Sequence, residues 1–283
     1  MARTSLRLGL AIILLVSVLL FRSTLASLWN NGFHSIPVDV RNGTASAMPE
    51  TPDRVVVVGK MKHEDTEWVI EDLYDWQHAI YTVDDPTAPL TVPKNKGHEG
   101  NVYLQYILDN YHALPSTIVF LHSHRDGYPL AWHTEFDTHS NPITVQRLKT
   151  DFVQRNGYVN MRCNPYPGCP NELLPLRNPP DPMRGPEYVY GEAWKKLFNN
   201  TNVPEVVGAA CCAQFAVSRE QVLKRGYGEY EWFHSWLMET ELPDDISGRV
   251  LEYMWHVIFG KEAVYCPDME QCYRDVYGVY SDY

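Results

Sequence analysis

The chain after residue 53 alternates between short β-branched runs and segments with helical spacing. Continuous apolar runs at residues 54–59, 79–83 and 117–121 predict three strands buried on both faces of a sheet. Apolar residues spaced as on one face of a helix predict helices at 64–73 and 101–111 between them. Strand, helix, strand, helix and strand with short links are typical of a single doubly wound, mostly parallel α/β sheet.

The second half of the chain has a less regular pattern. Residues 164–186 are dense in Pro and Gly, which predicts a long surface excursion. Residues 206–217 are small and apolar, Gly226 and Gly228 predict a turn, and helices are expected at 232–238 and 248–260. We find no internal repeat, so residues 54–283 are interpreted as one domain.

The first 26 residues have the pattern of a targeting segment. Residues 1–7 carry two positive charges and no acidic residue, and an uncharged, mostly aliphatic run follows from 8 to 21. We favour an uncleaved type II membrane anchor at 8–26, with 1–7 as a cytoplasmic tail and 27–53 as a polar stem. The alternative is a cleaved signal peptide and a secreted protein. Both interpretations place residues 54–283 in the secretory pathway, in the lumen of the ER or Golgi or beyond it.

Composition and charge exclude several function classes. The net charge of −11 argues against a nucleic-acid partner, since phosphate binding needs many Lys and Arg residues. A nucleotide diphosphate could still bind at a local site or through a metal. The chain has no P-loop, no dinucleotide-binding glycine motif, no serine-hydrolase elbow and no kinase signature. We therefore predict neither NAD nor haem as a cofactor, and the oligomeric state stays open.

The cysteines and sequons fit an oxidising, glycosylating compartment. Spacing suggests two local disulfides, Cys163 with Cys169 and Cys266 with Cys272. Two sequons predict N-glycosylation at Asn42 and Asn199.

Two further cysteines, Cys211 and Cys212, are adjacent in the sequence. They could bond to each other, bond to distant thiols, or serve as small buried apolar residues. We favour the last two possibilities over a bond between neighbours.

Ligands of doubly wound sheets bind beyond the carboxyl ends of the strands, so the loops there are candidate sites. His122, His124 and Asp126 follow the third predicted strand, and alternate side chains of a strand share a face. They could hold a divalent metal or contact a diphosphate. Alternatively, they are a polar strand exit whose imidazoles bond locally. His133 lies nearby in the sequence and could add a fourth ligand.

Two other loops reach the same edge of the predicted sheet. Asp84 and Asp85 directly follow the second strand, where carboxylates could accept hydrogen bonds from a ribose or a base. Asp-Asp-Pro is equally typical of a capped turn. Lys96 and Gly97 precede a predicted helix, whose N-terminal amides could bind an anion.

A candidate catalytic pair lies on the last long predicted helix. Glu252 and His256 are four residues apart, so they would share one side of helix 248–260. They could act as a base and its orienting partner or bind metal. An ordinary helix pair at the edge of the core is the structural alternative.

Several strings together resemble the DUF3431 family of fungal and bacterial proteins, which is uncharacterised. They are Pro-Lys-Asn-Lys-Gly-His-Glu-Gly at 93–100, Phe-Leu-His-Ser-His-Arg-Asp at 120–126, Gln-Phe-Ala-Val-Ser-Arg at 214–219 and Glu-Tyr-Met-Trp at 252–255. More distantly, the order strand, Asp-Asp, Asn-X-Gly, helix, strand and His-X-His-X-Asp resembles the donor half of GT-A glycosyltransferases. Those enzymes carry Asp-X-Asp where this chain has His122-Ser-His124.

The GT-A resemblance implies a role for each candidate residue. Asp84 or Asp85 would hold the nucleoside. His122, His124 and Asp126 would coordinate Mn²⁺ or contact the diphosphate. Glu252 or His256 would lie near the acceptor, a small molecule or a glycan.

Three function hypotheses follow. The first is a lumenal glycosyltransferase that uses a nucleotide-sugar donor. The second is a metal-dependent oxidase or hydrolase of fungal secondary metabolism, with His122, His124 and His133 as imidazole ligands. The third is a non-catalytic lumenal binding protein that kept such a fold.

Overall fold

The computed structural model describes residues 53–136 and 138–280. The predicted anchor or signal peptide, nearly all of the stem and the sequon at Asn42 lie outside these residues. Within the described ranges, no helix is both long and apolar enough to cross a bilayer.

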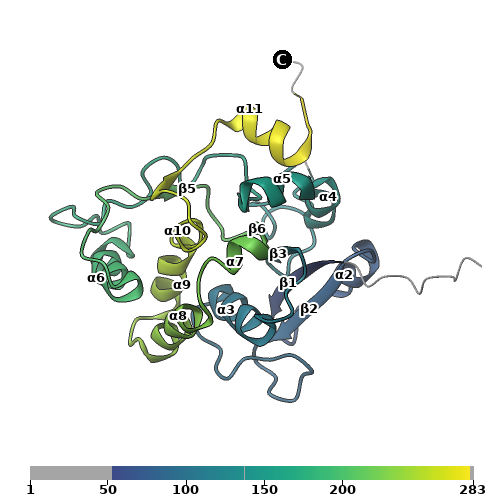
Figure 1. The fold of residues 1–283 in the computed structure, drawn as a ribbon, viewed down its shortest axis with the longest axis horizontal. Coiled ribbons are helices and arrows are strands. Elements are labelled where there is room, and N and C mark those ends of the chain that lie inside the picture. Colours follow the sequence, from purple (N-terminus) through teal and green to yellow (C-terminus); the bar gives the residue numbers. More distant parts are fainter. Residues whose placement is uncertain (1–52, 137, 281–283) are drawn as a thin grey trace, which may run out of the picture. The chain divides into compact units, whose positions relative to one another are not determined.

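A five-stranded sheet with the order β2-β1-β3-β6-β4 is the centre of the fold (Figure 1). β1 pairs in parallel with both β2 and β3, whereas β6 pairs antiparallel with β3 and with β4. The sheet is therefore mixed, and the expectation of a mostly parallel sheet was wrong for its β6 and β4 side. Its strands are β1 (Arg54–Lys60), β2 (Gln77–Thr82), β3 (Thr117–Leu121), β4 (Tyr158–Asn160) and β6 (Phe215–Ser218).

A second, two-stranded sheet joins β5 (Gly208–Ala209) to β7 (Val264–Tyr265) in parallel. The helices are α2 (Glu67–Asp72), α3 (Glu99–Asn110), α4 (Asn141–Arg147), α5 (Thr150–Asn156), α6 (Glu187–Phe198), α7 (Arg219–Val222), α8 (Tyr227–Glu239), α9 (Asp244–Glu252), α10 (Trp255–Ile258), α11 (Met269–Cys272) and the π-helix η1 (Tyr273–Tyr277).

Helices cover both faces of the large sheet because its strands are apolar on both sides. Alternate residues of a strand point to opposite faces, so Val55 and Val57 enter one core while Val56 and Val58 enter another. The first core also contains residues of α3, α6, α8, α9 and α10. The second contains residues of α2, α4, α5, α11 and η1. The result is an α/β domain with three layers.

The first half of the chain matches the sequence-based prediction more closely than the second. β3 has the predicted bounds, and β1, β2, α2 and α3 lie within a few residues of theirs. The predicted helix at 248–260 is divided into α9 and α10 near Tyr253 and Met254. Gly228 lies inside α8 and not in a turn, while Gly226 caps that helix.

All six cysteines are in disulfides, but the predicted pairing was wrong. Cys163 bonds to Cys272 and Cys169 bonds to Cys266, across 109 and 97 positions of sequence. The two cysteine-containing segments lie side by side in space, so two long-range bonds replace the two local bonds that were predicted.

The adjacent residues Cys211 and Cys212 bond to each other, which is the possibility that we had favoured least. The backbone has positive φ at Cys212 (84°) and Ala213 (49°). Such values are uncommon for residues with a side chain, and they mark a strained turn directly before β6.

Candidate active site at the carboxyl ends of the central strands

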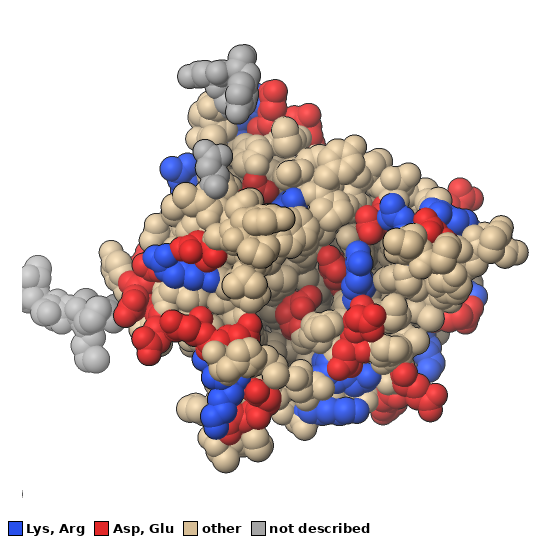
Figure 2. Space-filling model, turned by 180° about the vertical axis from the view of Figure 1, so that it is seen from behind, with Lys and Arg blue, Asp and Glu red and all other residues tan. Residues whose placement is uncertain are grey.

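A cavity of about 280 Å³ opens where β1 and β3 end and α3 begins. Its lining combines carboxylates, imidazoles and backbone from these three elements, as the rule for ligand sites in α/β sheets leads one to expect. The polar residues that line it are Lys60, Glu64, Asn95, His98, Glu99, His122, Ser123 and His124. In Figure 2 the surface is hollowed near the middle of one face, and acidic side chains lie around and inside that hollow.

Glu64 joins the ends of β1 and β3 at this cavity. One carboxylate oxygen accepts a hydrogen bond from the Met61 backbone at 2.6 Å, and the other accepts one from the Ser123 hydroxyl at 2.7 Å. Trp68 of α2 also donates to the Ser123 carbonyl at 3.0 Å. Sequence analysis did not select Glu64, and its place near the start of a predicted helix was the only signal.

His122 and His133 form a buried pair of neutral imidazoles. Their ring centroids are 4.6 Å apart, and the Nε2 atom of each is buried without a hydrogen-bond partner. Burial, followed by the neighbouring imidazoles, lowers the pKa of His122 to about 4 and that of His133 to about 3. Gln214 of the segment before β6 accepts a hydrogen bond from the His122 backbone at 2.9 Å. His122 and His133 therefore lie together, and their role as metal ligands stays a prediction.

The predicted metal set of His122, His124 and Asp126 does not converge. Asp126 pairs with Arg125 at the surface, and Arg125 also pairs with Asp72 at 3.0 Å. Across residues 53–136 and 138–280, one group of three ligand-bearing residues has its atoms within 4.8 Å of one another. That group is Cys211, Cys212 and Glu252, whose two sulfurs are already bonded to each other. As placed, the three predicted ligands do not fit Mn²⁺.

Asp84 and Asp85 form the capped turn that was the alternative interpretation. Asp84 accepts a hydrogen bond from the Lys62 backbone at 2.7 Å. Asp85 accepts from the Thr87 backbone and hydroxyl at 2.9 and 2.6 Å and pairs with the Lys62 ammonium at 2.9 Å. The hydrogen bonds from Thr87 and Lys62 lower the pKa of Asp85. Neither carboxylate lines the cavity, although the preceding Val83 does.

Lys96 and Gly97 hold two elements together and do not face the cavity. The Lys96 ammonium is buried, and it donates to the Leu242 carbonyl at 3.0 Å and pairs with Asp244 at 3.5 Å. The Gly97 N–H donates to the same Asp244 carboxylate at 3.2 Å. The prediction of an anion site at these two residues was wrong because their donors are used to fix the start of α9 against the start of α3.

Glu252, at the C-terminal end of α9, is a buried carboxyl with a raised pKa. One oxygen accepts a hydrogen bond from the Cys212 N–H at 2.6 Å, beside the Cys211–Cys212 disulfide. Burial, followed by the charge of Glu99, raises the pKa of Glu252 to about 7. Burial also raises the pKa of Glu99, which lines the cavity. Glu99 and Glu252 are thus neighbouring carboxyls that cannot both ionise easily.

His256 is not the partner of Glu252. Because the helix is interrupted after Glu252, the two residues do not share a continuous helical face. The His256 ring is fully buried, and its Nε2 lies 3.0 Å from the Ala263 carbonyl. Burial lowers the pKa of His256 to about 4. The predicted catalytic pair was therefore wrong for His256, and Glu99, like Glu64, was not among the residues selected from the sequence.

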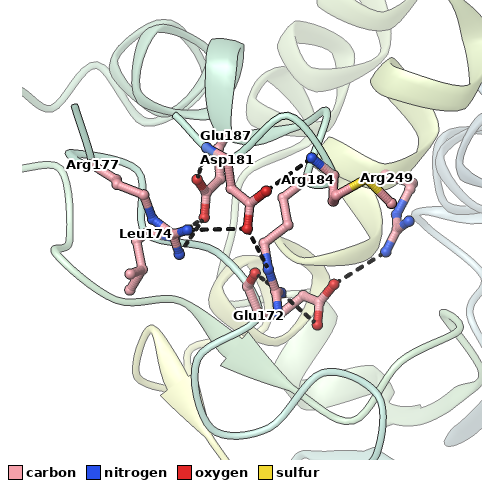
Figure 3. Close-up of polar contacts among 8 residues, drawn as sticks. Glu172, Leu174, Arg177, Asp181, Arg184, Glu187 and Arg249 are labelled. Carbon is pink, nitrogen blue, oxygen red and sulfur yellow. Dashed lines mark hydrogen bonds and ion pairs between the residues drawn. The ribbon is translucent and has the colours of Figure 1, made fainter. Parts of the chain in front are cut away.

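A network of alternating charges joins Arg249 to the excursion that precedes α6 (Figure 3). Arg249 lies between Glu252 at 3.7 Å and Glu172 at 3.3 Å. The network of ion pairs continues through contacts of 3.0 to 3.8 Å among Glu172, Arg184, Asp181, Arg177 and Glu187. Residues 172–187 are thereby held close to the end of α9, and one end of the network is the carboxyl with the raised pKa.

The comparisons with known proteins give a family and no function. A family model described as protein of unknown function (DUF3431) matches residues 56–275. The chain belongs to the DUF3431 family. The matched region of this DUF3431 protein runs from β1 into η1, and it includes Glu64, Glu99, His122, His133 and Glu252. No curated protein and no solved structure matches the chain.

Proposed function

We propose that this DUF3431 domain is a glycosyltransferase that moves a sugar from a nucleotide-sugar donor to a hydroxyl group of a small molecule or glycan. The observation that carries the proposal is Glu252, whose pKa of about 7 suits a general base at neutral pH. Its neighbour Glu99 lines the cavity at the carboxyl ends of β1 and β3, the edge at which α/β sheets bind their ligands.

In the proposed reaction, the acceptor hydroxyl gives its proton to Glu252 as its oxygen attacks the anomeric carbon of the donor sugar. The bond from that carbon to the diphosphate breaks, and the nucleoside diphosphate leaves with the electron pair. Cys212 donates to one oxygen of Glu252 at 2.6 Å and Arg249 approaches the other at 3.7 Å, so the carboxylate has a fixed orientation. Nearby Glu99 keeps the proton affinity of Glu252 high.

The donor diphosphate would bind in the cavity lined by His98, His122 and His124. A neutral imidazole can donate one N–H to a phosphate oxygen, and the buried Nε2 of His122 has no partner within the protein. Asp84 stands next to Val83 at the cavity, so a nucleoside contact for Asp84 stays a prediction. Mn²⁺ dependence also stays a prediction, and no step above depends on it.

The proposal includes a lumenal location with a type II anchor at residues 8–26. Three disulfides within the described residues support an oxidising compartment. Golgi or ER residence and the identity of the acceptor remain parts of the proposal.

A thermal-shift screen of the full chain tests the donor site first. We expect one class of nucleoside diphosphate to stabilise the protein, by about 2.7 kcal/mol at 100 times its dissociation constant. The response should be lost in His122→Ala and kept in His112→Ala, which changes a histidine outside the cavity. Turnover is then measured as release of the diphosphate with acceptor extracts. Absence of stabilisation by every nucleotide, with and without Mn²⁺, would contradict the proposal.

A metal-dependent oxidase or hydrolase is the second candidate, and one observation favours it. The Nε2 atoms of His122 and His133 are buried without partners, and their rings are close together. Two neutral imidazoles in this arrangement suit Cu²⁺ or Zn²⁺. If one of these metals stabilises the full chain, if His133→Ala abolishes the effect, and if nucleotides have no effect, the second candidate replaces the first.

A further inference from the structure

The sequon at Asn199 lies on an exposed turn at the end of α6. Asn199 is the residue that ends the helix, with a left-handed backbone (φ 47°, ψ 43°), and Asn199, Asn200 and Thr201 are all exposed. An N-X-Thr sequence in this position is accessible to the glycosylation machinery of the secretory pathway.

Asn199 is one of the residues that line a groove of about 560 Å³ between α6 and α8. The groove is within the size range of small-molecule sites. Its walls carry apolar and aromatic residues together with charged ones, and the lining residues that matter most are Tyr188, Lys195, Lys196, Asn199 and Trp232.

Two aromatic residues of this groove are about half exposed. Trp232 is 52% exposed and Tyr188 is 57% exposed. Trp232 is also held in place, because its indole N–H donates to the Lys196 carbonyl at 2.9 Å, three residues before Asn199. The indole is fixed and half exposed near the glycan attachment point Asn199. Its apolar surface is therefore available to pack against an attached group.

We propose that the groove between α6 and α8 is the docking site of the glycan attached to Asn199, with the first N-acetylglucosamine packed on the indole face of Trp232. Sugar rings have an apolar C–H face that fits an electron-rich aromatic face. Their hydroxyl and acetamido groups can hydrogen-bond to Glu192, Lys195 and Lys196 at the rim. The occupant follows from the sequence itself, since the sequon delivers a glycan to the mouth of the groove.

The test is a double-mutant cycle on the full chain expressed in a eukaryotic secretory host. Thr201→Ala removes the sequon and leaves Asn199 in place, and Trp232→Ala removes the indole. Mass spectrometry of the peptide gives the occupancy of Asn199. We expect loss of the glycan to lower the Tm by about 2 to 4 °C, which corresponds to about 1 kcal/mol in a domain of this size. In the Trp232→Ala background, the same loss should leave the Tm unchanged.

Two controls separate the glycan contact from other causes. Trp232→Phe loses the hydrogen bond to Lys196 but keeps an aromatic face, so it should retain most of the Tm difference. Thr44→Ala removes the other sequon, at Asn42. The Tm change it causes should be the same with Trp232 in place and in the Trp232→Ala background. With the glycan trimmed to one labelled N-acetylglucosamine, the acetyl methyl NMR signal should show an upfield ring-current shift that Trp232→Ala abolishes. An unoccupied Asn199, or an equal Tm change in both backgrounds with no ring-current shift, overturns the proposal.

Discussion

The two sides of the large sheet are built in different ways. The β2-β1-β3 side forms from consecutive elements between residues 54 and 121, with parallel pairing and short helical connections. The β6-β4 side pairs strands that residues 161–214 separate, and disulfides across 109 and 97 positions lie beside it. The two sides share both cores. The first side therefore depends more on local pattern, and the second depends on distant contacts and covalent links.

The candidate site lies where the two sides meet. Glu64, Glu99 and His122 come from the first side, while Gln214 and Glu252 come from later segments. In the proposed reaction, the cavity assigned to the donor belongs to the consecutive side and the proposed base to the distant one.

The largest expected effect is on the cross-linked side. Replacing Cys163 and Cys272 by Ser should lower the free energy of unfolding by about 3 kcal/mol, because the bond closes a loop of about 14 residues through the remaining Cys169–Cys266 bond. Denaturant unfolding measures the loss. Hydrogen exchange should increase in β4 and η1 more than in β1 and β2.

The matched control is the double substitution of Cys211 and Cys212 by Ser. That disulfide closes almost no loop, so its entropic contribution is small. If the two double substitutions lower the free energy of unfolding equally, or if hydrogen exchange increases equally in β1 and β4, the distinction between the two sides fails.

The next effect concerns Glu252, which is buried at the meeting of the sides. As pH rises from about 4.5 to 7, the unfolded state loses the Glu252 proton before the folded state does, so the folded protein loses stability. Glu252→Gln has no proton to lose. Near pH 4 the variant should have the same free energy of unfolding as the wild type, and above pH 7 this free energy should be higher by up to about 3 kcal/mol. Turnover should fall by about 10² to 10⁴. Unfolding curves at several pH values measure this, with the exposed Glu231→Gln as control. A constant difference at all pH values would refute the raised pKa.

A smaller effect is expected at the contact between the starts of α3 and α9. Lys96→Met removes the buried ammonium that bonds to Leu242 and Asp244. The free energy of unfolding should therefore fall by about 1.5 to 3 kcal/mol. Lys94→Met, at an exposed neighbour, should have little effect. Equal melting temperatures for the two variants would show that Lys96 does not join these elements.

The smallest effect is expected at the turn after β2. Asp85→Asn breaks an exposed ion pair with Lys62 but can keep an acceptor for Thr87, so the Tm should change very little. Nucleotide binding should also persist, since Asp85 does not line the cavity. A loss of binding without a loss of stability would return Asp85 to the role of nucleoside ligand.

The sequence predicted what local pattern encodes. Four consecutive β-branched residues identified β1, and the polar residues after β3 pointed to the cavity that His122 and His124 line. Periodicity could not show that β6 would insert antiparallel between β3 and β4, since that depends on contacts between distant segments.

The errors at the site have similar causes. The break after Glu252 separated it from His256, and it depends on packing and not on a helix-breaking Pro or Gly. The lysine at position 96 looked free in the sequence, but Asp244, 148 positions later, supplies its partner. Spacing also favoured local disulfides, although cysteines that are close in sequence bond to a segment brought near by the fold.

The most direct test of the account is a ¹³C NMR titration of the Glu252 carboxyl in the full chain, assigned with Glu252→Gln. The account predicts a titration midpoint near pH 7 that falls when Glu99→Gln removes the neighbouring charge. A midpoint near 4.5, unchanged by Glu99→Gln, would mean that Glu252 is an ordinary ionised carboxylate at neutral pH, and the proposed general base would be lost.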